Sequence, residues 1–110
     1  MKFKVPLRLP SLANTRMSWQ AMARLKRKQK DTTALAMRAV GGVTPTPPLV
    51  VTITRVGPRK LDDDNLAGAC KYVRDAIANC IGLDDGSDLY TWVYRQRIGP
   101  YSVEVEIIER

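Results

Sequence analysis

The sequence predicts an α+β fold, a two-layer domain with a four-stranded mixed sheet and two main helices in the order β-α-β-α-β-β. Three observations predict this class. Four segments have the alternation or the β-branched content of strands, and two others repeat apolar residues at helical spacing before a glycine. The chain has 110 residues, which suits a single domain over residues 1–110 with one modest core. We expect both helices to cover the same face of the sheet.

The first predicted strand covers residues 2–9, where alternate side chains are apolar and would form one buried face: Phe3, Val5, Leu7 and Leu9. Pro6 has no backbone N–H, so we expect this strand at an edge of the sheet or paired over only part of its length. Residues 10–16 form a predicted loop. Within this loop Asn14 could cap a turn or contact a ligand, and the local turn role is favoured.

The first predicted helix covers residues 18–40, with Ser18 as its N-cap and Gly41 and Gly42 as its stop. Its first half has apolar residues at helical spacing, which predict a buried stripe of Trp19, Met22 and Leu25. An interruption of this helix near residues 31–33 is left open.

The second predicted strand, residues 49–56, is apolar on both faces and is therefore expected at the centre of the sheet. The second predicted helix covers residues 65–81, capped by Asp63 or Asp64 and stopped by Gly82. Two further strands are predicted over residues 89–97 and 101–107, with a turn between them. Five residues form the predicted buried stripe of the second helix: Leu66, Cys70, Val73, Ile77 and Ile81.

The composition narrows the class of protein and of site. No apolar run reaches the length of a membrane span, and residues 1–10 mix basic with apolar residues, unlike a secretory signal, so we expect an intracellular, cytoplasmic protein without a membrane partner. Cys70 and Cys80 have no metal-type spacing and the chain has no histidine, which predicts buried, reduced thiols and excludes a zinc site. Any hydrolysis must then use carboxylates, lysine and a metal ion.

The charge is segregated along the chain. The net charge is +7, although most of the acidic residues gather in one region, and a basic surface favours a polyanionic partner such as nucleic acid. The first helix contains a dense basic segment, which is either a solvated face or a surface that contacts the phosphate backbone. Its residues are Arg24, Lys26, Arg27, Lys28 and Lys30.

The acidic region begins with three consecutive aspartates, Asp62 to Asp64, directly before the second helix. Two such charges ~5 Å apart repel by roughly 3 kcal/mol at an effective dielectric constant of ~20, and a hard divalent cation removes that cost. The run is therefore a solvated turn or a metal site. An EF-hand is excluded, because the sixth and twelfth positions counted from Asp62 are Ala67 and Val73 instead of glycine and glutamate.

A carboxylate site for Mg²⁺, or Mn²⁺, is the chemistry that remains. Asp62 and Asp64 flank a turn into a helix, and Asp85 would add a third oxygen ligand. Lys71 could bend back toward the aspartates and stabilise negative charge in a phosphodiester hydrolysis, or it could pair with Asp75 on the same helix. The residues alone leave open a nuclease, a non-catalytic nucleic-acid-binding protein, and a protein-interaction or structural role.

These residues resemble the RusA-like family of Holliday junction resolvases, which phages and prophages often encode. The likeness rests on Asp62-Asp63-Asp64-Asn65, on the Leu83-Asp84-Asp85 turn, and on a helix with a lysine between them. Pro10, Ser11 and Asn14 resemble the family's N-terminal loop, and the order of elements agrees. One departure is that Gly68 stands where the family usually has its lysine, and Lys71 comes about one turn later.

The resemblance implies a Mg²⁺-dependent, structure-selective endodeoxyribonuclease that acts as a homodimer on four-way DNA junctions, in the nucleoid of a bacterial or phage-infected cell. Asp62, Asp64 and Asp85 would bind the metal and Lys71 would be the catalytic lysine. The alternatives are a nuclease for other branched or flap DNA, and a dimeric branched-DNA-binding protein without cleavage. The expected DNA-binding residues are Asn14, Arg16, Arg24, Lys26, Arg27, Lys28, Lys30, Arg59 and Lys60.

Overall fold

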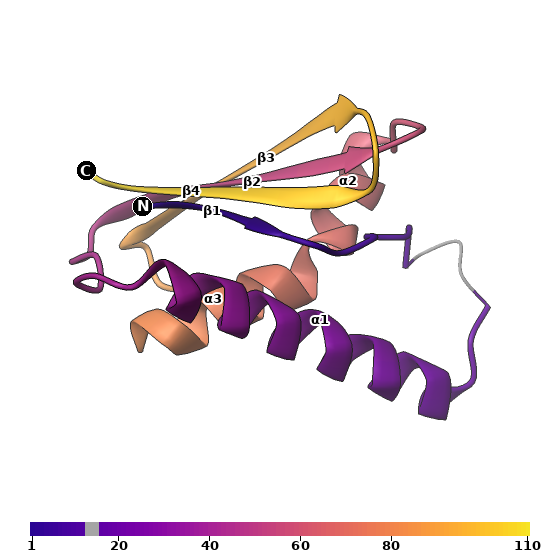
Figure 1. Cartoon of the computed structure of the whole chain (residues 1–110), viewed down its shortest axis with the longest axis horizontal. Helices are drawn as coiled ribbons and strands as arrows, with labels where there is room; N and C mark the ends of the chain where they lie inside the picture. The colour runs from indigo at the N-terminus through magenta and orange to yellow at the C-terminus, as the bar shows by residue number, and fades with distance from the viewer. Residues whose placement is uncertain (13–15) are drawn as a thin grey trace.

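The computed structural model describes residues 1–12 and 16–110, and it has two layers, with the helices on one face of a sheet (Figure 1). This arrangement confirms the predicted α+β class and the predicted order, with two consecutive helices in place of the second predicted one. In chain order the elements are β1 (Lys2–Val5), α1 (Trp19–Val40), β2 (Leu49–Gly57), α2 (Asp63–Ala69), α3 (Lys71–Ile81), β3 (Tyr90–Ile98) and β4 (Ser102–Glu109).

The sheet has the strand order β1-β4-β2-β3 and is mixed. β4 is antiparallel to both β1 and β2, while β2 and β3 are parallel and are joined by the α2–α3 segment. β2 is thus an inner strand, as its two apolar faces predict, and β1 is an edge strand. β3 forms the other edge and contacts α2.

The first strand is shorter than predicted, because β1 ends at Val5, immediately before Pro6. The amide of Leu7 turns back to the carbonyl of Val5 at 2.8 Å and takes the chain out of the ladder. The predicted burial nevertheless continues beyond the strand, since Leu7 and Leu9 are both buried in the core. The apolar period therefore predicts burial correctly and overestimates the pairing.

α1 begins and ends as predicted and runs without interruption through residues 31–33. The Ser18 hydroxyl accepts a hydrogen bond from the Ala21 amide at 3.1 Å, and Gly41 ends the helix with a φ of 71°. The predicted apolar stripe is wrong at Trp19, whose side chain is 77% exposed. The buried residues of α1 lie from its middle onward instead: Gln29, Thr33 and Met37.

The predicted second helix is divided at Cys70 into α2 and α3, which point in different directions (Figure 1). It also begins earlier than predicted, with Asp62 rather than Asp63 or Asp64 as its N-cap. At the break the Cys70 amide is shared between the carbonyls of Leu66 and Ala67, at 3.2 and 3.3 Å, in place of a single helical bond. Cys70 at the break and Val73 beyond it are both fully buried in the core.

Candidate functional site

The three consecutive aspartates stand where the chain leaves the inner strand β2 and enters α2. Asp62 is the N-cap residue with an extended backbone, at φ −62° and ψ 155°, and its side chain makes no capping hydrogen bond. Asp62, Asp63 and Asp64 are all exposed. The positive end of the helix dipole offsets part of their repulsion. Oxygen ligands of this kind, close together and accessible, suit a hard divalent cation.

Two side chains from the sheet fix the turn that leads into this acidic run. The Gln96 side chain bonds Leu61 on both sides of its peptide, accepting from its amide at 2.8 Å and donating to its carbonyl at 2.7 Å. The Arg55 guanidinium, in a residue only 5% exposed, donates to the carbonyls of Leu9 and Arg59, both at 2.8 Å. The residue before Asp62 is therefore held as firmly as a strand residue.

Gly57 is part of this support. A Cβ atom at Gly57 would lie 3.1 Å from the nearest Arg55 nitrogen, which is closer than an ordinary van der Waals distance. The glycine thus gives the guanidinium the room that it needs between the two loops.

The second acidic segment, after α3, is held by Arg74. Its Nε and Nη2 atoms donate to a carboxylate oxygen and to the carbonyl of Asp85, each at 3.0 Å, and its Nη1 donates to the Tyr94 hydroxyl at 2.8 Å. The guanidinium lies over the Trp92 ring, 4.8 Å from its centroid, and the indole N–H donates to the Asp85 carbonyl at 2.9 Å. Asp85 is therefore fixed by its backbone and by its side chain.

The electrostatics of this segment follow from its contacts. Partial burial lowers the pKa of Arg74, but the hydrogen bond and charge of Tyr94 and the carboxylate of Asp85 outweigh it, so the net shift is upward. Burial raises the pKa of Tyr90, and the charges of Asp85 and Asp84 raise it further. The Tyr90 hydroxyl donates to the Leu83 carbonyl at 2.9 Å. Both groups keep the protonated form that their hydrogen bonds need.

The two acidic segments are anchored on the same strand but at different heights. Trp92 holds Asp85 and Gln96 holds Leu61, and four residues of strand span about 13 Å. Within residues 1–12 and 16–110, no three acidic or cysteine side chains form a group that could hold a metal ion. The structure thus brings Asp62 and Asp64 to one helix start and leaves Asp85 in its ion pair with Arg74.

Lys71 is the first residue of α3, just beyond the break, and its side chain is exposed. The predicted polar row from Asp64 through Lys71 assumes one straight helix, and the division at Cys70 ends that continuity. The Lys71 ammonium lies 5.9 Å from the centre of the Tyr72 ring, and the Lys26 ammonium of α1 lies 5.8 Å from the same ring. The ion pairs of the described residues do not include one between Lys71 and Asp75.

The predicted DNA-binding residues fall into two exposed groups. Most of them are on α1 between residues 24 and 30, where Lys30 is half-buried and reaches a pocket of about 350 Å³ that is also lined by Asp75, Asp84 and Asp85. Arg59 and Lys60 lie in the loop before the aspartates and are exposed. Asn14 lies outside the described residues. The exposed members on and before α1 are Arg16, Arg24, Lys26, Arg27 and Lys28.

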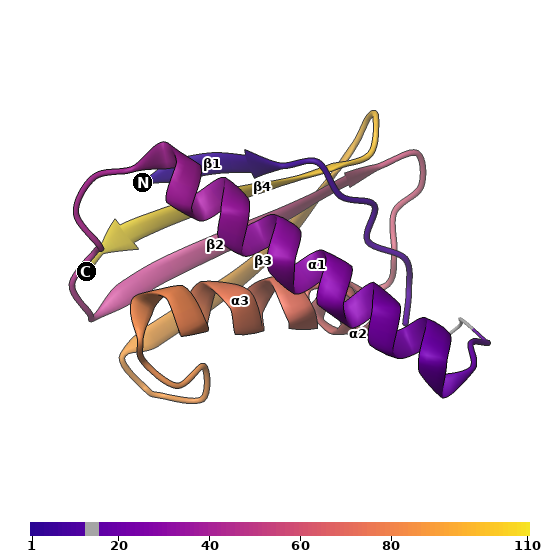
Figure 2. The ribbon, with the colours of Figure 1, turned by 60° about the horizontal axis from the view of Figure 1, so that its bottom comes forward.

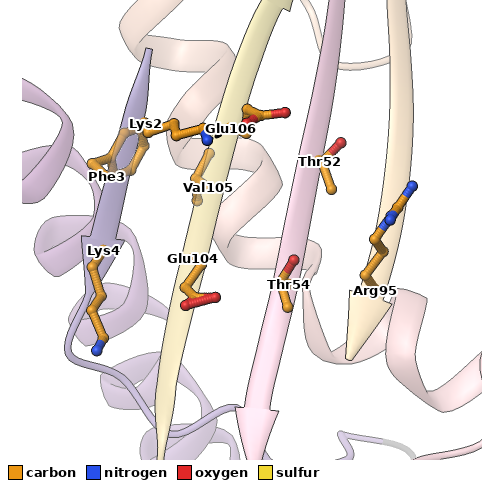
Figure 3. Close-up of a pocket in the computed structure, with 9 residues that line it drawn as sticks. All are labelled: Lys2, Phe3, Lys4, Thr52, Thr54, Arg95, Glu104, Val105 and Glu106. Atoms are coloured by element: carbon orange, nitrogen blue, oxygen red, sulfur yellow. Dashed lines mark ion pairs between the residues drawn. The ribbon is translucent and has the colours of Figure 1, made fainter. Parts of the chain in front are cut away.

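A wider pocket, about 640 Å³, lies on the face of the sheet that the helices leave open (Figure 3). Lys2 and Glu106 point toward one another across it and form an ion pair at 3.1 Å, and Arg97 pairs with Glu104 on the same face. These two ion pairs neutralise part of the charge on this face, which lacks the run of consecutive like charges that α1 and the start of α2 have. The pocket's lining residues are Lys2, Phe3, Lys4, Thr52, Thr54, Arg95, Glu104, Val105 and Glu106.

Sequence reasoning missed the three residues that position the acidic segments, Arg55, Arg74 and Gln96. A signal for two of them was available. An arginine inside an apolar strand needs buried hydrogen-bond partners such as carbonyl groups. Along one face of β3 every side chain carries a polar group at its end, and such groups need hydrogen-bond partners when they are buried: Tyr90, Trp92, Tyr94 and Gln96. Arg74 has no such signal, because it reads as an ordinary charge on a helix.

No model of a protein family matches the chain, and none of the curated proteins matches it. In the described part of the chain, no helix is both long and apolar enough to cross a membrane.

Proposed function

We propose that this protein is a Mg²⁺-dependent endodeoxyribonuclease that acts on branched DNA, with four-way junctions as its main substrate. The observation that supports this most is the run of three exposed carboxylates at the fixed start of α2, in a protein of net charge +7. Arg55 and Gln96 hold the residues that precede these carboxylates, and this support suits a site that must keep two ligands in place.

In the proposed reaction Asp62 and Asp64 bind the cation and orient it toward the scissile phosphate. When bound, Mg²⁺ would supply an activated water and neutralise charge on the phosphate. Lys71 approaches the phosphate from the head of α3 and stabilises the developing negative charge. Asp85 would add a third ligand only if its segment left Arg74 and Trp92 and moved toward the start of α2. A junction needs two paired cuts and each chain offers one site, so we propose that the protein acts as a homodimer.

The proposal is tested by nicking of a synthetic four-way junction in Mg²⁺, Mn²⁺ or EDTA, beside a linear duplex of the same sequence and a flap. We expect paired, metal-dependent cuts on the junction, lost in Asp64→Asn with junction binding retained. Asp88→Asn is the matched control, because Asp88 is exposed and lies outside the acidic run. Cuts that persist in Asp64→Asn, or equal cutting of the linear duplex, would contradict it.

A second candidate is a dimeric protein that binds branched DNA without cutting it. The ion pair between Arg74 and Asp85, and the separation of Asp85 from the aspartates of α2, favour this alternative. It predicts tight junction binding in EDTA and no nicks with either metal. Preferred cutting of the flap would instead assign the nuclease a different branched substrate.

A further inference from the structure

The most exposed large aromatic side chain of the described residues lies at the start of the basic helix. Trp19 is the first residue of α1, and its side chain is 77% exposed, with Met17 beside it at 39%. The Ser18 cap fixes the backbone at this point, so the indole is presented from an ordered turn. No residue of α1 before Gln29 is buried, and the first turns project away from the sheet (Figures 1 and 2).

Trp19 shares one side of α1 with two lysines. Lys26 and Lys30 follow it by seven and eleven residues, which places both within about 20° of it around the helix. This side meets α3, because the Lys26 ammonium lies 5.8 Å from the centre of the Tyr72 ring. Lys71 approaches the same ring from α3 at 5.9 Å. Aromatic rings and ammonium groups thus alternate across α1 and the head of α3, in the order Trp19, Lys26, Tyr72, Lys71, which we call the aromatic–lysine track.

The charge around the track selects a polyanion. Residues 16–30 contain six basic residues and no acidic one. Among the described residues, the ion pairs of the molecule involve none of these six. Two copies of such a surface repel one another, whereas phosphate groups would neutralise it. An exposed indole within this field suits the π-face of a base.

We propose that the aromatic–lysine track binds an unpaired nucleic-acid strand, with one base stacked on Trp19 and phosphates on Lys26 and Lys71. This inference rests on the proposed action on branched DNA and names the feature of that DNA that the protein selects. The bases of an intact duplex are covered by their neighbours in the stack, while a strand at a branch or flap offers free base faces. Trp19 therefore favours branched and single-stranded DNA over duplex.

The test measures binding in EDTA, where no cleavage is possible. A fluorescein-labelled oligothymidine and a duplex are titrated with wild type and with Trp19→Ala, Trp19→Phe and Leu35→Ala. We expect Trp19→Ala to weaken oligothymidine binding about tenfold and duplex binding less than about twofold. Trp19→Phe keeps a ring and most of the affinity. Leu35→Ala, which removes a 69% exposed side chain from the same helix outside the track, leaves the affinity unchanged.

Tryptophan fluorescence gives a second readout. The oligothymidine should quench the wild-type emission, and the quench should be absent in Trp19→Phe, because Trp92 is covered by Arg74 and Tyr90. Equal losses for oligothymidine and duplex, or no loss at all, would overturn the proposal. A change in oligomeric state alone would assign Trp19 to an interface between copies and would overturn it too. Junction nicking by the wild type is scored separately, so a failure of this inference can be distinguished from a failure of the proposed function.

Discussion

Cys70 is the residue at which α2 gives way to α3, and burial raises the pKa of its thiol to about 12, although the charge of Arg55 opposes the shift. In the unfolded chain the thiol ionises near its ordinary pKa of 9.0. The stability that comes from keeping it neutral is therefore complete below pH 9 and is lost as the pH rises from 9 toward 12.

We predict that the free energy of unfolding falls by about 1.4 kcal/mol per pH unit in this window through Cys70 alone. Urea unfolding at about pH 8 and about pH 10 should show the fall in wild type and in Cys80→Ala. Cys70→Ala should lack that part of the fall. An identical pH dependence in Cys70→Ala would mean that other groups account for all of it.

Arg74 is the residue on which the second acidic segment depends. We predict that Arg74→Met lowers the free energy of unfolding by about 1–2 kcal/mol. This figure is the contribution of hydrogen bonds from a charged group, reduced because the guanidinium is partly exposed to solvent. Because Asp85 shares these bonds, the double variant with Asp85→Asn should lose less than the sum of the two single losses. Urea midpoints measure all three variants, with Arg95→Met, an exposed arginine of β3, as the control. Additive losses would show that the pair does not act as a unit.

At the scale of the elements, local signals predicted much of the fold. Three residues mark helix ends by their own conformations: Ser18, Gly41 and Gly82. The alternation of buried and less buried residues along β4 follows from its pairing in the sheet. The break at Cys70 could not be predicted, since it depends on how the faces of two helices pack against the core. The place of Asp85 could not be predicted either, because it depends on Arg74 meeting Tyr94 across a gap of twenty residues.

α1 shows why an apolar stripe can mislead. Its fully buried positions include Gln29, whose amide nitrogen and oxygen have no hydrogen-bond partner among the described residues, while Trp19 is exposed. An unpaired buried amide costs about 1–3 kcal/mol. We predict that Gln29→Met, of similar length, raises the free energy of unfolding by about 1 kcal/mol. Gln20→Met, at an exposed position of the same helix, should change it little. A loss of stability in Gln29→Met would indicate that a bound water satisfies the amide.

For the whole molecule, the charge distribution separates α1 from the open face of the sheet. Arg24, Arg27 and Lys28 are exposed on α1, whereas Lys2 and Arg97 are engaged by glutamates on the sheet. We predict that neutralising the three α1 residues weakens DNA binding and lowers the slope of log affinity against log salt by about 0.9 for each phosphate that is no longer neutralised. Neutralising Lys2, Arg97 and Arg110 removes the same charge and should leave the slope nearly unchanged. Equal effects of the two triple variants would show that the net charge of the protein alone determines the affinity for DNA.

The attachment of both acidic segments to side chains of β3 has a consequence for how the chain can vary in length. Gln96 and Trp92 set the distance between the two acidic segments by the pitch of a strand, so this distance does not depend on how many residues α2 and α3 contain. A residue added or removed next to Cys70 would rotate one helix by about 100° relative to the other and take buried side chains such as Leu66 or Val73 out of the core. The number of residues in α2 and α3 is therefore set by the core, and a change in it would move Lys71 while the two attachments on β3 stay where they are.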